Sequence, residues 1–209
     1  MNQLLEKKYL KLQNGSDVRG VALENPDGEQ VNLTPEIVTY IAAAFAEYLA
    51  EKVGKDMSEL TISVGHDSRL SADALKAGVL AGIQKQGCQA VDCSLASTPS
   101  MFMSTVLPQL SYDGAIMITD SHLPFQRNGM KFFSKEGGLE SKEIKILLNK
   151  AIALPTCPSR LQCPVLCPLS SRSPSLLCPL PFGPLPVLPK RAPLVAPSTM
   201  RLTPSPRCI

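Results

Sequence analysis

The sequence predicts an α/β domain of three layers (α/β/α) with a mixed, partly parallel sheet, over residues 1–153. Short apolar runs typical of buried strands alternate with amphipathic stretches typical of helices. Polar loops follow two of these runs, and strand, loop and helix units of this kind build parallel sheets. The composition then changes abruptly, since 14 of the 19 prolines lie in residues 154–209. We therefore expect one folded domain followed by a proline-rich tail.

The first elements are predicted from breaks and end signals. Residues 11–23 should be extended chain interrupted at Asn14-Gly15. A helix should run from the Thr34-Pro35-Glu36 start signal, where a hydroxyl caps and proline opens the first turn, to Gly54. Residues 60–64 alternate like a strand, and the helix over 72–86 that follows should be capped by Ser71.

The remaining elements repeat this order. Residues 89–94 predict a short strand, and Ser97-Thr98-Pro99-Ser100 opens a helix that ends before Pro108. In this helix we expect four side chains to face inward: Met101, Phe102, Thr105 and Val106. Strands follow over 115–118 and 130–133, and a last helix should extend from about Glu140 to Ile152.

Charge and composition exclude several classes of protein. The chain has 21 basic and 18 acidic residues, and six basic and no acidic residues lie in 154–209. Residues 1–153 therefore carry a net charge of −3, which gives a nucleic-acid partner no support. No apolar run reaches the length that spans a membrane, and no signal peptide is evident. Cys88 and Cys93 are expected to be small core residues.

The tail over 154–209 has no helical or strand periodicity and contains no aspartate or glutamate. So much proline removes backbone donors, so we expect this segment to be disordered. A proline-rich string can dock into SH3-like grooves. The abrupt change also fits translated non-coding or frame-shifted sequence. Its five cysteines lack the spacing of a zinc site.

The most informative stretch is Thr119-Asp120-Ser121-His122-Leu123-Pro124, with Asn128-Gly129-Met130-Lys131 shortly after it. It follows a predicted buried strand, and open α/β sheets bind ligands at the carboxyl ends of their strands. By composition alone it could be a polar surface loop with an ordinary Asn-Gly turn.

Two earlier motifs precede it, Asp17-Val18-Arg19-Gly20 and Gly65-His66-Asp67-Ser68-Arg69-Leu70-Ser71. Taken alone, Arg19 reads as a solvated charge beside a turn. Asp67 and Arg69 could simply pair and brace their loop. We expect His66 to be an exposed variant and not a ligand.

Together with Thr98-Pro99, these motifs resemble, in the correct order, the first of the four domains of the α-D-phosphohexomutases, the phosphoglucomutase and phosphomannomutase superfamily. The resemblance implies an intramolecular phosphotransferase of carbohydrate metabolism. Ser121 would carry the phosphoryl group and offer one oxygen to a metal ion, Arg19 would stabilise charge, and Lys131 would bind phosphate or transfer a proton. Substrate-binding positions would be His122, Arg69 and Asn128, with His122 also bracing the loop.

The resemblance also implies magnesium as cofactor, a hexose 1,6-bisphosphate as activator and a hexose phosphate as substrate. An intracellular protein is expected, cytoplasmic or plastidic, and residues 132–139 suggest a plant or algal branch. The family's Asp-Gly-Asp metal loop, its Gly-Glu-x-Ser-Gly sugar loop and its Ser-Gly-Thr phosphate loop have no counterpart in this sequence. The alternative to an enzyme domain is therefore a non-catalytic fragment or binding module.

Asp120 and Leu123 depart from the family's usual Thr-Ala-Ser-His-Asn-Pro pattern. A carboxylate beside a phosphoserine is electrostatically adverse, because the phosphate adds about −1.5 to −2 charges. Adjacent residues of an extended segment project to opposite sides. We therefore expect the Asp120 carboxylate to face elsewhere or to pair with a basic side chain, while the Ser121 hydroxyl shares a concavity with Arg19 and Lys131.

Overall fold

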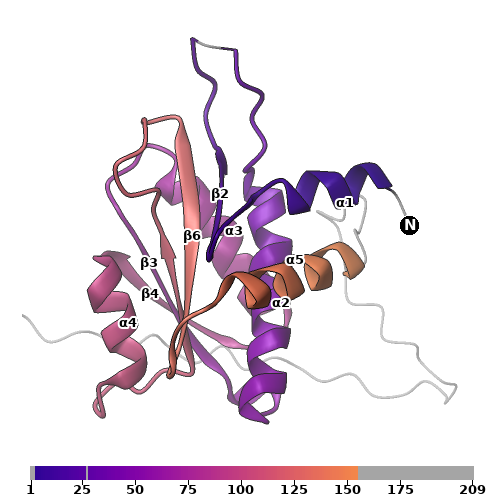
Figure 1. Cartoon of the computed structure of the whole chain (residues 1–209). Coiled ribbons are helices and arrows are strands. Elements are labelled where there is room, and N and C mark those ends of the chain that lie inside the picture. Colours follow the sequence, from indigo (N-terminus) through magenta and orange to yellow (C-terminus); the bar gives the residue numbers. More distant parts are fainter. Residues whose placement is uncertain (1–2, 27, 155–209) are drawn as a thin grey trace, which may run out of the picture. The chain divides into compact units, whose positions relative to one another are not determined.

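The structure is a computed structural model that describes residues 3–26 and 28–154. The predicted tail lies outside these residues, apart from Leu154. Figure 1 shows the elements in chain order. They are α1 (Gln3–Leu10), β1 (Gln13–Asn14), β2 (Asp17–Val21), α2 (Pro35–Val53), the 3₁₀ turn η1 (Met57–Glu59), β3 (Thr61–His66), α3 (Ala72–Lys85), β4 (Gln89–Leu95), α4 (Thr98–Val106), β5 (Gly114–Ile118), β6 (Arg127–Ser134), β7 (Gly137–Gly138) and α5 (Ser141–Ala153).

The strands form one mixed sheet in the order β1-β2-β6-β5-β3-β4, with β7 paired to β6. β3 pairs in parallel with both β4 and β5, whereas every other pairing is antiparallel. The predicted α/β class and the mixed, partly parallel sheet are therefore confirmed. Helix α1 was not predicted from the sequence.

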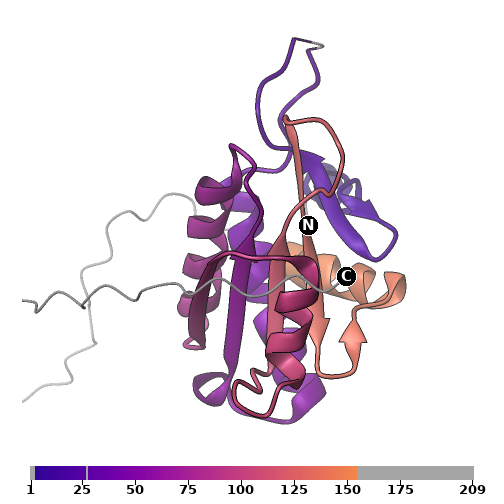
Figure 2. The same cartoon turned by 90° about the vertical axis from the view of Figure 1, so that its left-hand side faces the viewer.

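The two faces of the sheet are covered unequally (Figures 1 and 2). Side chains from α2, α3 and α5 pack on one face, where they build the large core with strand residues such as Ile62, Ile116 and Phe132. On the other face lies α4, and the buried cluster there is small: Met101, Ala115 and Met117. Polar side chains of β2 and β6 can therefore remain accessible on the face that α4 covers only in part.

Helix α2 begins and ends where its sequence predicts. The Thr34 hydroxyl accepts a hydrogen bond from the Ile37 amide, and Gly54 closes the helix with a φ of 69°. Glycines allow α3 to pack closely against it, because a Cβ at Gly78 or Gly82 would meet α2 carbonyl oxygens at 2.4 and 2.2 Å. This contact fixes the position of α3 behind the sheet.

Two predictions about helix ends and faces were wrong. Ser71 does not cap α3, because its hydroxyl instead accepts a hydrogen bond from Asn128 Nδ2 at 2.8 Å. In α4, Met101 and Thr105 face inward, but Val106 is 46% exposed. Val106 is the last residue of this nine-residue helix, and its side chain faces solvent instead of packing on the sheet.

Candidate active site

The polar face of β2 and β6 follows from strand register. Arg19 pairs with Gly129 across the antiparallel ladder, and Lys131 lies two residues further along β6. Because side chains alternate along a strand, Asp17, Arg19 and Lys131 share one face, on the α4 side of the sheet. Gly129 has to lack a side chain, since a Cβ there would meet Val18 O at 2.7 Å and Arg19 Cγ at 3.1 Å.

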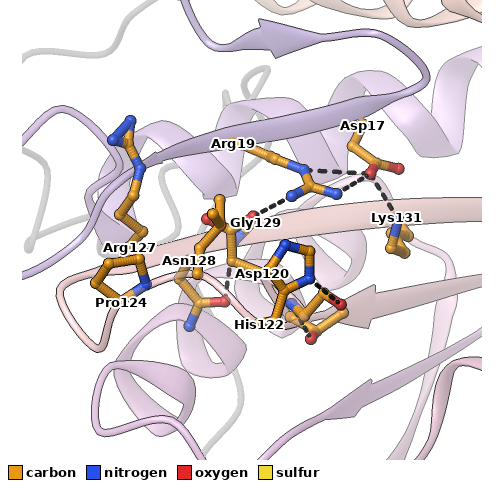
Figure 3. A network of polar contacts seen from close by, with 12 residues as sticks. Asp17, Arg19, Asp120, His122, Pro124, Arg127, Asn128, Gly129 and Lys131 are labelled. Atoms are coloured by element: carbon orange, nitrogen blue, oxygen red, sulfur yellow. Dashed lines mark hydrogen bonds and ion pairs between the residues drawn. The ribbon is translucent and has the colours of Figure 1, made fainter.

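Asp17 joins the two cations. Its Oδ2 atom accepts hydrogen bonds from Arg19 Nη2 at 2.8 Å and from Lys131 Nζ at 2.5 Å, as Figure 3 shows. The hydrogen bond to Asp17 is also the main reason that the pKa of Arg19 is raised. Both cationic side chains are partly exposed, at 20% for Arg19 and 24% for Lys131. They are thus positioned by a carboxylate and still reachable from solvent.

Ser121 follows β5 at its carboxyl end, as predicted. Its φ is 55°, in the left-handed region that residues with a Cβ seldom adopt. Two hydrogen bonds stabilise this turn. The Ser121 amide donates to Thr119 Oγ1 at 3.0 Å, and Thr119 Oγ1 donates to Asp67 Oδ2 at 2.7 Å. The turn leaves the Ser121 side chain exposed to solvent.

The Ser121 hydroxyl has one polar neighbour among the residues that the structure describes, the ring of His122. Ser121 Oγ and His122 Nδ1 lie 3.3 Å apart, and both residues are exposed. The contact is long for an O–H···N hydrogen bond. The imidazole ring is nevertheless near enough to orient the Ser121 hydroxyl.

Arg69 organises the loop that follows Ser121. Nη1 donates to the carbonyls of Pro124 and Arg127 at 2.9 Å, and Nη2 donates to those of Ser121 and Leu123 at 2.8 Å. Nε donates to Asp67 at 3.2 Å. All five guanidinium N–H groups are therefore engaged. This geometry matches the bracing role that the sequence left open, and in this conformation it leaves no donor for a substrate.

Asn128, a predicted substrate-binding residue, is fully buried. Its Oδ1 accepts from the Gly129 amide at 2.8 Å, and its Nδ2 bonds the Ser71 hydroxyl. Asn128 thus lies in β6 with its side chain joined to Ser71 at the start of α3, where it is not exposed to a substrate.

Asp120 is paired with a base, as expected. Arg19 Nη1 lies 2.8 Å from Asp120 Oδ1, and the Asp120 side chain is wholly buried. The ion pair is close, but its angles fall short of hydrogen-bond geometry, and within residues 3–26 and 28–154 neither carboxylate oxygen has a hydrogen-bond partner. Burial raises the pKa of Asp120 above its usual value, although Arg19, Arg69 and Arg127 oppose this shift.

The expected shared concavity is not found in the cavity that Arg19 lines. That cavity measures about 490 Å³ and also borders Leu123, Pro124 and Arg127. Its lining includes neither Ser121 nor Lys131. The loop over residues 119–126, which carries Ser121, is called the serine loop. The Arg19 guanidinium lies between the Asp17–Lys131 pair and Asp120 of this loop.

The residues described here do not by themselves fit a magnesium ion, which prefers an octahedral set of oxygen ligands. Among them, no three His, Cys, Asp or Glu side chains are grouped to hold a metal. Asp17 and Asp120 are occupied by Arg19, and Asp67 accepts from Thr119 and Arg69. Ser121 is left as a single exposed oxygen donor.

Sequence reasoning offered Asp67 as a possible brace with Arg69, and the structure shows that pair, but it did not identify Asp17 and Thr119 as residues that hold the site in place. Asp17 could have been found, because it lies two residues before Arg19 on a strand and must share its face. Thr119 and Asp67 are 52 residues apart, and their hydrogen bond depends on the parallel pairing of β3 with β5.

Comparison with known proteins extends over the same segment. Residues 10–153 match the family model of phosphoglucomutase/phosphomannomutase, alpha/beta/alpha domain I. A probable phosphoglucosamine mutase of Methanopyrus kandleri is 37% identical over 53% of this chain and 22% of its own length. The phosphoglucosamine mutase of Ruminiclostridium cellulolyticum is 34% identical over 68% of this chain and 30% of its own length.

A solved structure shares the fold. The phosphoglucomutase/phosphomannomutase family protein of Burkholderia thailandensis matches 70% of this chain and 30% of its own with a TM-score of 0.56, at 22% identity. The chain therefore spans only about a fifth to a third of the length of these relatives.

Proposed function

This chain belongs to the phosphoglucomutase/phosphomannomutase family as its α/β/α domain I, and on that premise we propose that it is the serine-carrying part of a hexose-phosphate mutase. The reaction class is intramolecular phosphoryl transfer. Ser121 accepts a phosphoryl group from a hexose bisphosphate and returns it to a hexose phosphate.

The observation that carries this proposal is the conformation of Ser121. A left-handed turn at the end of β5, fixed by Thr119, Asp67 and Arg69, presents an otherwise ordinary hydroxyl to solvent. Strained backbone of this kind is retained where the surrounding contacts impose it, and it is frequent at functional sites. Ser94 and Ser111 are also exposed and left-handed, with φ of 54° and 45°. Ser121 differs from them because it follows β5 at its carboxyl end, in a loop that Arg69 and Thr119 hold beside Arg19 and Asp120.

Arg19 and Lys131 have the roles that electrostatics supports. Phosphoryl transfer depends mostly on positioning and on stabilising charge at the transferring oxygens. Two partly exposed cations held by Asp17 provide fixed positive charge on the polar face of the sheet. We assign charge stabilisation to Arg19, and phosphate binding or proton transfer to Lys131. His122 orients the Ser121 hydroxyl.

Phosphoryl transfer of this kind would also use a metal ion and a bisphosphate activator. Magnesium and a hexose 1,6-bisphosphate are the cofactors expected of the family, and the carboxylates near Ser121 are already engaged by other side chains.

No helix of the described residues is long and apolar enough to cross a membrane. Several curated relatives are phosphoglucosamine mutases, so glucosamine phosphates are tested beside glucose and mannose phosphates.

We expect the isolated chain to be inactive as a mutase. The test measures turnover of glucose, mannose and glucosamine 1-phosphates with glucose 1,6-bisphosphate and magnesium present. No turnover above background is expected. Turnover in the parent that is lost in Ser121→Ala would show that the chain is a complete enzyme and would contradict this part of the proposal.

The second candidate function, a non-catalytic binding module, is favoured by one feature. Asp17 and Asp120 together balance the charges of Arg19 and Lys131, so this part of the site carries no net charge. A site without net positive charge attracts a phosphoryl group less strongly. Removal of the Asp120 carboxylate distinguishes the two functions, because it should increase turnover only in a domain whose serine transfers phosphoryl groups.

A further inference from the structure

Helix α4 buries polar side chains and exposes apolar ones. Two of its three buried residues are polar: Ser104 Oγ bonds Ser63 Oγ at 2.8 Å, and the Thr105 hydroxyl donates to a backbone carbonyl of β6 at 3.3 Å. A surface helix normally shows the reverse pattern. The helix and the turn after it carry four apolar side chains that are between 39% and 46% exposed, which we call the apolar stripe: Met103, Val106, Leu107 and Leu110. Their spacing, at positions i, i+3, i+4 and i+7, is typical of a helix face that packs against another element.

Backbone hydrogen bonds hold the apolar stripe in one conformation. The Leu107 amide donates to Met103 O at 2.9 Å, and the Ser111 amide donates to Leu107 O at 2.8 Å. The Tyr112 amide then donates to Ser104 O at 3.1 Å, so the turn after α4 folds back on the helix. The stripe is therefore a preformed surface, and a preformed surface loses little conformational entropy when a partner binds.

The segment that carries the apolar stripe has no charged side chain. Residues 93–112 contain no Asp, Glu, Lys, Arg or His, in a chain of which 19% is charged. Helix α4 packs on β3, β5 and β6. Figure 2 views the molecule from the side of α4, and no other helix or strand of the described residues lies over it. Exposed apolar side chains without charges among them are typical of the core of a protein–protein interface.

The absence of charge favours a second copy of this chain as the partner. A two-fold dimer brings the same residues together from both copies, so a charge in the contact would lie near its own like charge, which is costly. The apolar stripe avoids this cost, and it offers no charged group that would select a different protein. We propose that two copies of the chain associate through the apolar stripe, with their α4 helices packed against each other. Since the stripe has four residues and a standard interface has roughly 20–30 a side, the dimer should be weak.

Sedimentation velocity of the full-length chain measures this association from about 1 μM to 1 mM. A reducing agent is present, so that no disulfide joins two copies. We expect a reversible shift from monomer to dimer within this range. Val106→Lys should raise the dissociation constant at least about tenfold, because two lysines then meet across the contact, and a lysine suits the last turn of a helix. Ile146→Lys is the matched control, since Ile146 is an exposed apolar residue of α5 outside the stripe.

A mixture of two variants shows whether the apolar stripe meets itself. Val106→Lys and Val106→Glu should each associate poorly alone, and an equimolar mixture should associate more tightly, because opposite charges then meet across the contact. Circular dichroism confirms that each variant is folded. A parent chain that stays monomeric up to about 1 mM, equal effects of Val106→Lys and Ile146→Lys, or a mixture no tighter than its components would overturn the proposal. These measurements use neither turnover nor Ser121, so none of these outcomes bears on the mutase proposal.

Discussion

Arg19 lies between two carboxylates that differ in environment. Asp17 is hydrogen-bonded to two cations, whereas Asp120 is wholly buried with an ion pair to Arg19 and no hydrogen bond among the described residues. A buried carboxylate without hydrogen bonds costs free energy, because the charged form loses its hydration. Asp120 thus binds Arg19 at the expense of stability, and this has consequences that can be measured.

The first prediction concerns pH. The pKa of Asp120 is raised in the folded state, so between the unfolded and folded pKa values the native protein binds more protons than the unfolded chain. Stability from this group is therefore present at acid pH and is lost as pH rises through the folded pKa. Asp120→Asn should become more stable relative to the parent as pH increases from about 4 to 7. Urea unfolding of the parent and of Asp120→Asn across this pH range measures the difference in their free energies of unfolding.

Asp113→Asn is the matched control, with the opposite sign. Lys55 Nζ lies 2.7 Å from Asp113, and the pKa of this carboxyl is lowered by Lys55 and the Thr61 amide against the effect of burial. The parent gains stability from Asp113 as pH rises toward the unfolded carboxyl pKa of about 4, and the gain is complete above it. Asp113→Asn should therefore lose stability relative to the parent up to about pH 5 and keep a constant difference from there to pH 7. Identical pH profiles for the two variants would contradict the assignment of Asp120.

The sequence allowed part of this residue-scale arrangement to be predicted. The charge of Asp120 beside a phosphoserine predicted that its carboxylate would face elsewhere or pair with a base, and the structure shows it paired with Arg19. The candidate bases were Arg19, Arg69 and Lys131. The choice among them could not be predicted, because the Arg19–Asp120 contact joins β2 to the loop after β5, about 100 residues apart in sequence. Ser71 shows the reverse error, since a local capping signal was overridden by the tertiary contact with Asn128.

At the scale of elements, the serine loop depends on Arg69. We expect Arg69→Lys to destabilise the loop by about 2–3 kcal/mol, because an ammonium group cannot reproduce the planar fork that binds four carbonyls. The measurement is amide hydrogen exchange of Leu123 and Arg127, whose amides bond within the loop. Arg127→Lys is the control on the same loop, since its side chain makes only a loose ion pair. Equal protection in Arg69→Lys and the parent would show that Arg69 does not hold the loop.

The contact between α2 and α3 sets two effects against each other. Gly82→Ala should gain about 1 kcal/mol of helix propensity, but its Cβ would meet Thr39 O at 2.2 Å, and such overpacking costs about 1–3 kcal/mol. Because the backbone at Thr39 cannot move away easily, we expect Gly82→Ala to have a lower melting temperature than the parent. Ala81→Gly, at an exposed position of the same helix, gives the propensity effect alone. A stabilised Gly82→Ala would show that the helices can move apart.

At the scale of the whole molecule, the domain was predictable because strong local signals agree with one another. Caps, glycines and apolar periodicity gave the helices and strands of residues 34–152, and the structure confirms their order. Helix α1 was missed because its eight residues carry a weak pattern with Lys7 and Lys8 in the last turn. The order of strands in the sheet depends on long-range pairing, for which the sequence alone has no local signal.

The tail gives a prediction about the boundary of the folded domain. Apolar periodicity ends at Ile152, which packs in the large core. Deletion of residues 155–209 should therefore leave the melting temperature unchanged within error. A change of about 1 kcal/mol would move the melting temperature by several degrees in a domain of this size, so a fall of that order on deletion would contradict the predicted boundary.

The central claim, that this domain carries a competent phosphoryl-transfer serine, is tested most directly in a chimera. Residues 10–153 replace the matching domain of the Ruminiclostridium cellulolyticum phosphoglucosamine mutase, and mutase turnover is measured with Ser121 or Ala at position 121. Turnover that is abolished by Ser121→Ala is expected. Asp120→Ala should increase it, because Arg19 is then free of its buried competitor. A folded chimera without turnover, both with Asp120 and in Asp120→Ala, would contradict the claim.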